Sequence, residues 1–202
     1  MSILASMVVA LNMMMQGIDD TGTAVARPIG EVHFNEDTGS YYQIFDFIGK
    51  PPHTWVHARR MVKGYRYKDR EGRLAVIKDI SLHYFLLLNF PMLRQQKMWI
   101  GLSVECNETA DMTWVDGSSL ADQSFRGFGE GVLRDISRTC RARKDSGALY
   151  PIYYEPDQFG VRWQMADARA NLTYMMVEFP VPEEEAEGAA VDAEGEPTTP
   201  QQ

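Results

Sequence analysis

Cysteine is scarce in this chain: among 202 residues, only Cys106 and Cys140 carry a thiol. Two cysteines cannot build a disulfide-dense scaffold or a zinc site with four cysteine ligands. The composition favours two unpaired thiols, and Cys106, which lies in a polar stretch, is expected to be exposed. The sequence leaves open whether the two residues pair.

Positive charge is also in short supply, with 20 Lys and Arg against 28 Asp and Glu and a formal net charge of -8. Seven of the acids follow Pro182, where no Lys or Arg occurs, so residues 1–182 carry a net charge of about -1. The body of the chain has no basic excess that would neutralise phosphates. Nucleic acid is therefore not expected as a partner.

No apolar run reaches the roughly 20 residues that a membrane-spanning helix needs. The longest candidate, Met1 to Met15, is interrupted by Ser2, Ser6 and Asn12, and the first basic residue is Arg27. A secretory signal peptide would begin with a positively charged region. We therefore expect neither a membrane span nor secretion by that route.

Residues that would mark an enzyme are missing as well. The four histidines are His33, His53, His57 and His83. Their spacing matches neither a zinc-binding helix nor a catalytic triad, so they are expected to be structural or exposed. Gly127, Gly129 and Gly131 lack the Lys-Ser/Thr ending of a phosphate-binding loop. The chain is predicted to be no enzyme and to hold no cofactor and no metal.

Composition divides the chain into three parts: an apolar arm with its linker at residues 1–30, a globular domain at 31–182, and an acidic tail at 183–202. The arm is apolar all round, which demands burial on its own domain, on a sister subunit or on another protein. The tail has no aromatic residue and is rich in Glu, Ala, Gly, Pro and Thr, a composition typical of disorder.

Within the domain, periodicity predicts the elements of secondary structure. Residues 40–47 have the composition of a strand. A helix is expected after the N-cap Thr54, with Trp55, Ala58, Met61 and Val62 on its apolar face and its end near Gly64. Residues 74–77 predict a further strand, and Ser81 is expected to cap a second helix that stops before Pro91.

The second half of the domain carries strand-like stretches at residues 98–102, 112–115, 150–154 and 172–179, separated by Gly, Asp and Pro turns. Helices early and strands late favour an α+β fold in one domain.

Five short strings in this order resemble a C-type lectin-like domain over residues 31–182. They are Trp55-Val56-His57-Ala58, Gly72 to Ile77, Trp99-Ile100-Gly101-Leu102, Trp114 to Ser118, and Tyr174 to Phe179. The resemblance implies an α+β fold with two helices and antiparallel sheets. It also implies that the motif residues build the core and do not bind ligand. This structural set is Trp55, Ala58, Val62, Trp99, Ile100, Gly101, Leu102, Trp114 and Val177.

The chain departs from the family where its disulfide and calcium ligands usually lie. Val62 and Val177 stand at the positions of the usual disulfide, so an apolar contact is expected in its place and folding needs no oxidising compartment. Glu130 and Asp167 supply only a fragment of the six to eight oxygens that calcium requires. Related enzymes of the formylglycine-generating type use two late cysteines, whereas here Cys140 stands alone.

Residues 118–149 correspond to the family's long loop region, where a rigid scaffold usually presents its binding residues. The predicted contact residues are Phe125, Arg126, Phe128, Glu130, Arg134 and Arg138. The alternative is a structural insertion whose arginines form ordinary surface pairs.

These expectations combine into a functional hypothesis. A lectin-like domain without a secretion signal or family disulfides, but with an apolar arm, fits a bacteriophage structural protein that assembles in the host cytoplasm and leaves by lysis. We expect a non-enzymatic, homo-oligomeric virion component, either a capsid decoration or a tail, fibre or receptor-binding protein. Its arm would contact other virion proteins, and its loops a host-surface glycan or protein. The alternative is a bacterial calcium-independent lectin or protein-binding module.

Overall fold

The computed structural model describes residues 25–143, 147–157 and 160–182, which contain three α-helices and a mostly antiparallel sheet. The helices are α1 (Trp55–Val62), α2 (Ile80–Asn89) and α3 (Val132–Ala142), with short 3-10 turns η1 (Pro91–Arg94) and η2 (Leu120–Asp122). The long strands are β1 (Val25–Asn35), β2 (Ser40–Ile48), β6 (Met98–Cys106), β7 (Ala110–Trp114), β8 (Ala148–Asp157), β9 (Gly160–Met165) and β10 (Tyr174–Phe179). Two-residue strands are β3 (Arg66–Tyr67), β4 (Arg70–Glu71) and β5 (Arg73–Leu74). The α+β class predicted from the sequence is confirmed.

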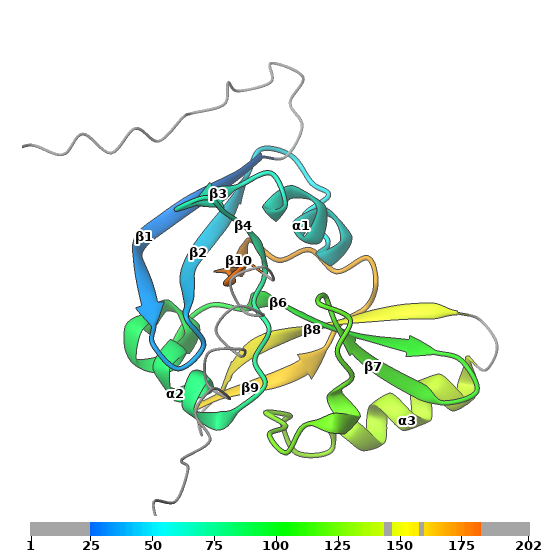
Figure 1. Ribbon diagram of the computed structural model, residues 1–202. Coiled ribbons are helices and arrows are strands. Elements are labelled where there is room, and N and C mark those ends of the chain that lie inside the picture. Colours follow the sequence, from blue (N-terminus) through cyan, green and yellow to red (C-terminus); the bar gives the residue numbers. More distant parts are fainter. Residues whose placement is uncertain (1–24, 144–146, 158–159, 183–202) are drawn as a thin grey trace, which may run out of the picture.

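The main sheet has the order β1-β2-β10-β6-β8-β9, with β5 on β10 and β7 on β6 (Figure 1). Every pairing is antiparallel except that of β10 with β6. The last strand therefore lies between β2, from the start of the domain, and β6, from its middle. The position of β10 beside β2 brings the two ends of the domain together. The long loop region lies between β7 and β8, on the other side of β6.

Two apolar clusters hold the layers together. One lies under α1 and includes Trp55, Ala58, Val62 and Val177, all at most 2% exposed. Helices α2 and α3 belong to the other cluster, which they enter through Leu82, Leu86, Val132, Ile136 and Cys140. Val62 and Val177 thus lie in the same core, as the apolar replacement of the family's disulfide requires.

The Trp-Ile-Gly-Leu string lies in β6, whose side chains point alternately to the two sides of the sheet. Trp99 packs in the cluster under α1, and Ile100 and Leu102 pack in the cluster with α2 and α3. Gly101 is needed because a Cβ there would be 2.8 Å from the carbonyl oxygen of Leu74. The Trp55 indole donates to the Ile100 carbonyl at 2.7 Å, which joins α1 to β6. All nine residues of the predicted structural set are buried.

Several local predictions differ from the structure. β1 begins at Val25, so residues 25–29, assigned above to the linker, pair with β2. The cap of α2 is Asp79, whose carboxylate accepts from the Leu82 N–H at 2.8 Å, in place of Ser81. Thr54 precedes α1 as expected, but its hydroxyl contacts His57 Nδ1 at 3.1 Å and caps no backbone N–H. Of the segment predicted as a strand at residues 74–77, only Leu74 lies in one, the two-residue β5, while Ala75 bonds to Met176 and Gly101 outside the named strands.

Candidate interaction surface

The segment between β7 and α3 is held to the sheet by backbone hydrogen bonds. The Trp163 N–H donates to the Gly127 carbonyl at 2.7 Å, and the Gly129 N–H donates to the Trp163 carbonyl at 3.1 Å. Phe128 thereby forms a parallel bridge with Trp163 of β9. Residues 127–129, assigned above to the long loop region, therefore pair with the edge strand β9 of the sheet.

Three aromatic rings meet Trp163 edge-on, with centroids at 5.3 Å for Phe125, 5.4 Å for Phe128 and 5.5 Å for Trp114. Such edge-to-face pairs add stability beyond their buried area. Gly127 lies against the same indole, since a Cβ there would be 2.7 Å from Trp163 Cε2. Phe125 and Phe128, two of the predicted contact residues, are consequently only partly exposed and act mainly as packing.

Residues 132–142 of the region form helix α3, which was not predicted. Val132, Ile136 and Cys140 recur every four residues and are buried. This spacing was visible in the sequence and could have indicated the helix. The helix begins after Gly131, whose φ of +77° suits glycine.

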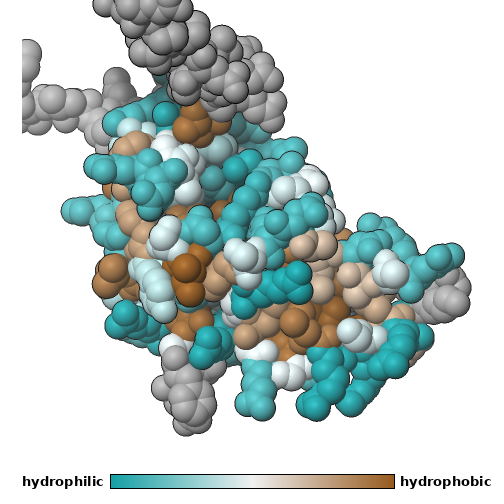
Figure 2. Space-filling view, turned by 60° about the horizontal axis from the view of Figure 1, so that its bottom comes forward, coloured by the Kyte–Doolittle hydropathy of each residue, from teal (hydrophilic) through white to brown (hydrophobic). Residues whose placement is uncertain are grey.

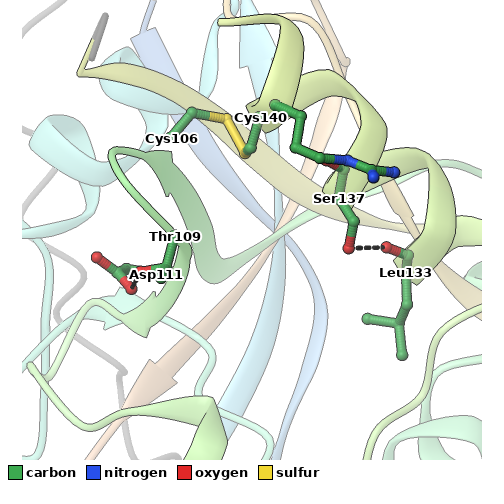
Figure 3. The surroundings of a disulfide bond; sticks show 7 residues. Cys106, Thr109, Asp111, Leu133, Ser137 and Cys140 are labelled. Atoms are coloured by element: carbon green, nitrogen blue, oxygen red, sulfur yellow. Dashed lines mark hydrogen bonds between the residues drawn. A yellow bond between two sulfur atoms is a disulfide. The ribbon is translucent and has the colours of Figure 1, made fainter. Parts of the chain in front are cut away.

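Cys140 forms a disulfide with Cys106, the last residue of β6, with a Cα–Cα distance of 4.8 Å (Figure 3). The expectation of two unpaired thiols and of an exposed Cys106 was wrong, because Cys106 is fully buried and lies opposite the helix. The bond ties α3 to the sheet across 34 residues of sequence.

The outward side of α3 is basic. Arg134, Arg138 and Arg141 follow one another at spacings of four and three residues, opposite the buried stripe, and all three are exposed. Asp135 pairs only loosely with Arg138, at 3.6 Å. Arg126 and Glu130 are exposed on the preceding segment. Of the six predicted contact residues, the four charged ones are therefore exposed around two packed aromatics.

Figure 2 views the molecule with this lower side turned forward, and apolar surface there is bordered by hydrophilic side chains. We call the exposed part of residues 118–142 the loop-helix surface.

Behind this surface is a small polar cluster around His83 of α2. Its Nδ1 lies 3.1 Å from the hydroxyl of Tyr154, and its ring centroid lies 5.2 Å from that of Phe125. Burial, with a smaller contribution from Arg162, lowers the pKa of His83 below its ordinary value. Burial likewise raises the pKa of Tyr154 far above that of a free tyrosine. Both groups are thus neutral near pH 7 and serve as hydrogen-bonding parts of the core.

The acids considered for calcium do not come together. The Asp167 carboxylate accepts from the Arg169 N–H at 2.8 Å and is used in a turn, while Glu130 is exposed on the loop-helix surface. Within the described residues, no three His, Cys, Asp or Glu side chains form a group suited to a metal ion.

A hollow of about 260 Å³ lies beside the end of β10 and was not predicted from the sequence. Three of its charged residues are in ion pairs: Arg73 binds Glu178 at 3.1 Å through two hydrogen bonds, and Lys78 binds Asp116 at 2.8 Å. The fourth, Asp79, accepts from the Leu82 N–H as the cap of α2. Ser40 and the Val76 N–H also donate to Glu178, which is 3% exposed. The carboxylate is therefore a structural anchor for β10.

The solved structures that resemble this chain include rhodocetin and EMS16. Rhodocetin shares 18% identity at a TM-score of 0.39 and is matched over 71% of this chain and 91% of its own. EMS16, described as an antagonist of the collagen receptor integrin alpha2beta1, shares 14% identity at a TM-score of 0.44, over 74% of this chain and 97% of its own. Both are non-enzymatic C-type lectin-like proteins. At these values the likeness concerns the course of the chain and carries nothing about a ligand.

Neither a protein-family model nor a curated protein matches the sequence. Among the described residues, no helix has the length and apolar character needed to cross a membrane.

Proposed function

We propose that this chain is a non-enzymatic binding protein that presents the loop-helix surface to a partner, and that it does so as a component of a bacteriophage virion. The observation that carries the proposal is the construction of that surface. Exposed charged side chains stand on a helix fixed at its inner side by a disulfide and on a segment fixed by the Trp163 ring contacts. A surface ordered before binding loses less entropy when a partner docks.

The disulfide bears on the compartment. Disulfides persist on virion and cell surfaces and are rare in a reducing cytosol. Because valines stand at positions 62 and 177 in place of a disulfide, the domain core can fold before oxidation. The Cys106–Cys140 bond can then form after lysis. A capsid decoration or a tail, fibre or receptor-binding protein that is released by lysis would follow this order of events. In the assembled particle we assign the contact with other virion proteins to the apolar arm.

The first experiment measures binding of the full chain to a glycan array and to intact bacterial cells. Arg134→Glu with Arg138→Glu reverses the charge of α3 without touching its buried stripe, and we expect binding to be lost. The matched control is Arg60→Glu with Lys63→Glu, because both residues are exposed at the end of α1, away from the loop-helix surface. Equal binding by the two variants would contradict the proposed contact surface.

The second experiment tests the virion assignment. An antibody against the domain is used to probe particles concentrated from lysates of the source culture. Detection in the particle fraction supports the proposal. A chain found only as free protein, with a glycan signal that calcium removal leaves unchanged, would replace it by the bacterial calcium-independent lectin or protein-binding module.

A further inference from the structure

Helix α2 is unusual for a surface helix because it has no charged residue between Ile80 and Asn89. Its inner side chains, Leu82 and Leu86, are buried. Its outer side nevertheless remains apolar, although a surface helix usually turns polar residues to solvent.

Three large apolar side chains on this outer side are exposed, at spacings of four residues: Ile80 by 51%, Tyr84 by 57% and Leu88 by 75%. Residues at this spacing lie on one face of a helix. They make up three of the seven large apolar side chains that are exposed within the described part of the chain. An apolar stripe of this kind marks a contact surface. We call it the α2 stripe.

A hollow lies at the C-terminal end of the helix, where Asn89 lines it. The hollow has a volume of about 150 Å³ and lies between β1 and the residues that follow α2. Ile29 and His33 line it from β1, and Asn89, Phe90 and Met92 line it from the other side. Helix α2 and the residues after it therefore lie beside β1, the strand that directly follows the arm and its linker.

We propose that residues 3–15 of the arm pack against the α2 stripe of the same chain, with the end of the arm nearest the linker at Leu88. The two surfaces are chemically matched, since the chain carries no charge before Asp19 and α2 carries none at all. Each is an apolar surface that requires cover.

The length of the chain permits this contact. The linker residues 17–24 span up to about 28 Å when extended. Along β1, the four residue-to-residue steps from Val25 to Ile29, at the hollow, cover only about 13 Å. The stripe from Ile80 to Leu88 is about 12 Å long, shorter than the thirteen residues that would cover it in any regular conformation.

Attachment through a short linker also favours the same chain over a second copy. A tethered segment has a local concentration in the millimolar range, well above that of free protein in solution. The inference concerns the free chain before assembly, and it does not depend on the proposed virion role.

The test is an engineered crosslink in the full chain. Met14→Cys is combined with Leu88→Cys, and the two thiols are oxidised by oxygen with copper phenanthroline, so that two hydrogens are lost when the disulfide forms. Leu88 is mostly exposed, so the substitution leaves folding intact, and Tyr84→Cys provides a second position on the same stripe. The native Cys106 and Cys140 are paired and buried.

The matched control combines Met14→Cys with Val56→Cys. Val56 is 54% exposed on α1, which contacts β1 directly, so mere nearness to the linker would favour this control. Val56 does not belong to the stripe.

We expect a crosslinked monomer with Leu88→Cys and Tyr84→Cys, seen on a non-reducing gel and by intact mass, and little with Val56→Cys. A crosslinked dimer would assign the stripe to the arm of a second copy and overturn the proposal. Equal crosslinking at Val56, or none at Leu88 and Tyr84, would overturn it as well.

Discussion

Arg73 and Glu178 form a two-pronged ion pair between the neighbouring strands β5 and β10, with both N···O distances at 3.1 Å. The Glu178 side chain is only 4% exposed, and Ser40 and the Val76 N–H complete its hydrogen bonds. Arg27 and Asp46 make the same two-pronged contact between β1 and β2, at 3.2 and 2.7 Å, but Arg27 is 61% exposed. The two ion pairs have the same geometry and differ in burial, so comparing them isolates the effect of burial on stability.

Replacing Glu178 by Gln is expected to lower the free energy of unfolding by about 3–5 kcal/mol, because it leaves the Arg73 guanidinium without its counter-charge in a largely buried place. Urea unfolding followed by circular dichroism measures the change. Asp46→Asn is the control and should cause little change, since water solvates the exposed Arg27. A similar loss in both variants would show that burial of the Glu178 pair is not decisive.

Removal of the disulfide is expected to destabilise the domain by about 4 kcal/mol, from the chain-entropy cost of a loop of 34 residues. Thermal unfolding of the native protein is compared with that of Cys106→Ala combined with Cys140→Ala. Reduction with dithiothreitol should lower the Tm of the native protein and leave that of the double variant unchanged. If the native protein shows no response to reductant, Cys106 and Cys140 are not joined in solution.

Substitution of Gly127 by Ala is expected to cost about 1–3 kcal/mol through overpacking, since the added methyl group would meet the Trp163 ring at 2.7 Å. The displaced indole should also change the tryptophan emission spectrum. Gly64→Ala is the matched control, because its Cβ would lie 3.5 Å from the Met61 carbonyl oxygen, an ordinary contact. Unaltered stability and emission of the Gly127 variant would mean that the segment does not rest on Trp163.

The protein should become less stable as the pH falls below about 6.5, the ordinary pKa of histidine. Burial lowers the pKa of His83 in the folded state, so in this range the unfolded state binds the additional proton. The free energy of unfolding therefore decreases with decreasing pH until the folded-state pKa of His83 is reached.

Comparison with His83→Gln isolates this effect, because carboxylates common to both proteins also titrate at low pH. Glutamine retains a polar partner for the Tyr154 hydroxyl but cannot titrate. The difference in unfolding free energy between the two proteins should narrow from pH 7.5 to pH 5. A constant difference would exclude His83 as the source of the pH dependence.

The class of the fold and much of its core could be predicted from the sequence alone. The offsets of Trp55, Ala58 and Val62 indicate α1, and Trp99 to Leu102 identify the central strand, because both depend on residues close together in the chain. The position of Val62 and Val177 in one core followed from the resemblance and agrees with the structure.

Which loop-region residues are available for binding depends on tertiary packing and could not be predicted from the sequence. Phe125 and Phe128 pack on Trp163, more than thirty residues further along the chain, while Arg134 and Arg138 remain outside. The pairing of Cys106 with Cys140 and the exposure of the α2 stripe have the same origin. The ring packing, the disulfide and the exposed stripe all depend on which surfaces of the fold meet. Periodicity in the sequence indicates which residues share a face of a helix or strand, but it does not indicate what that face contacts.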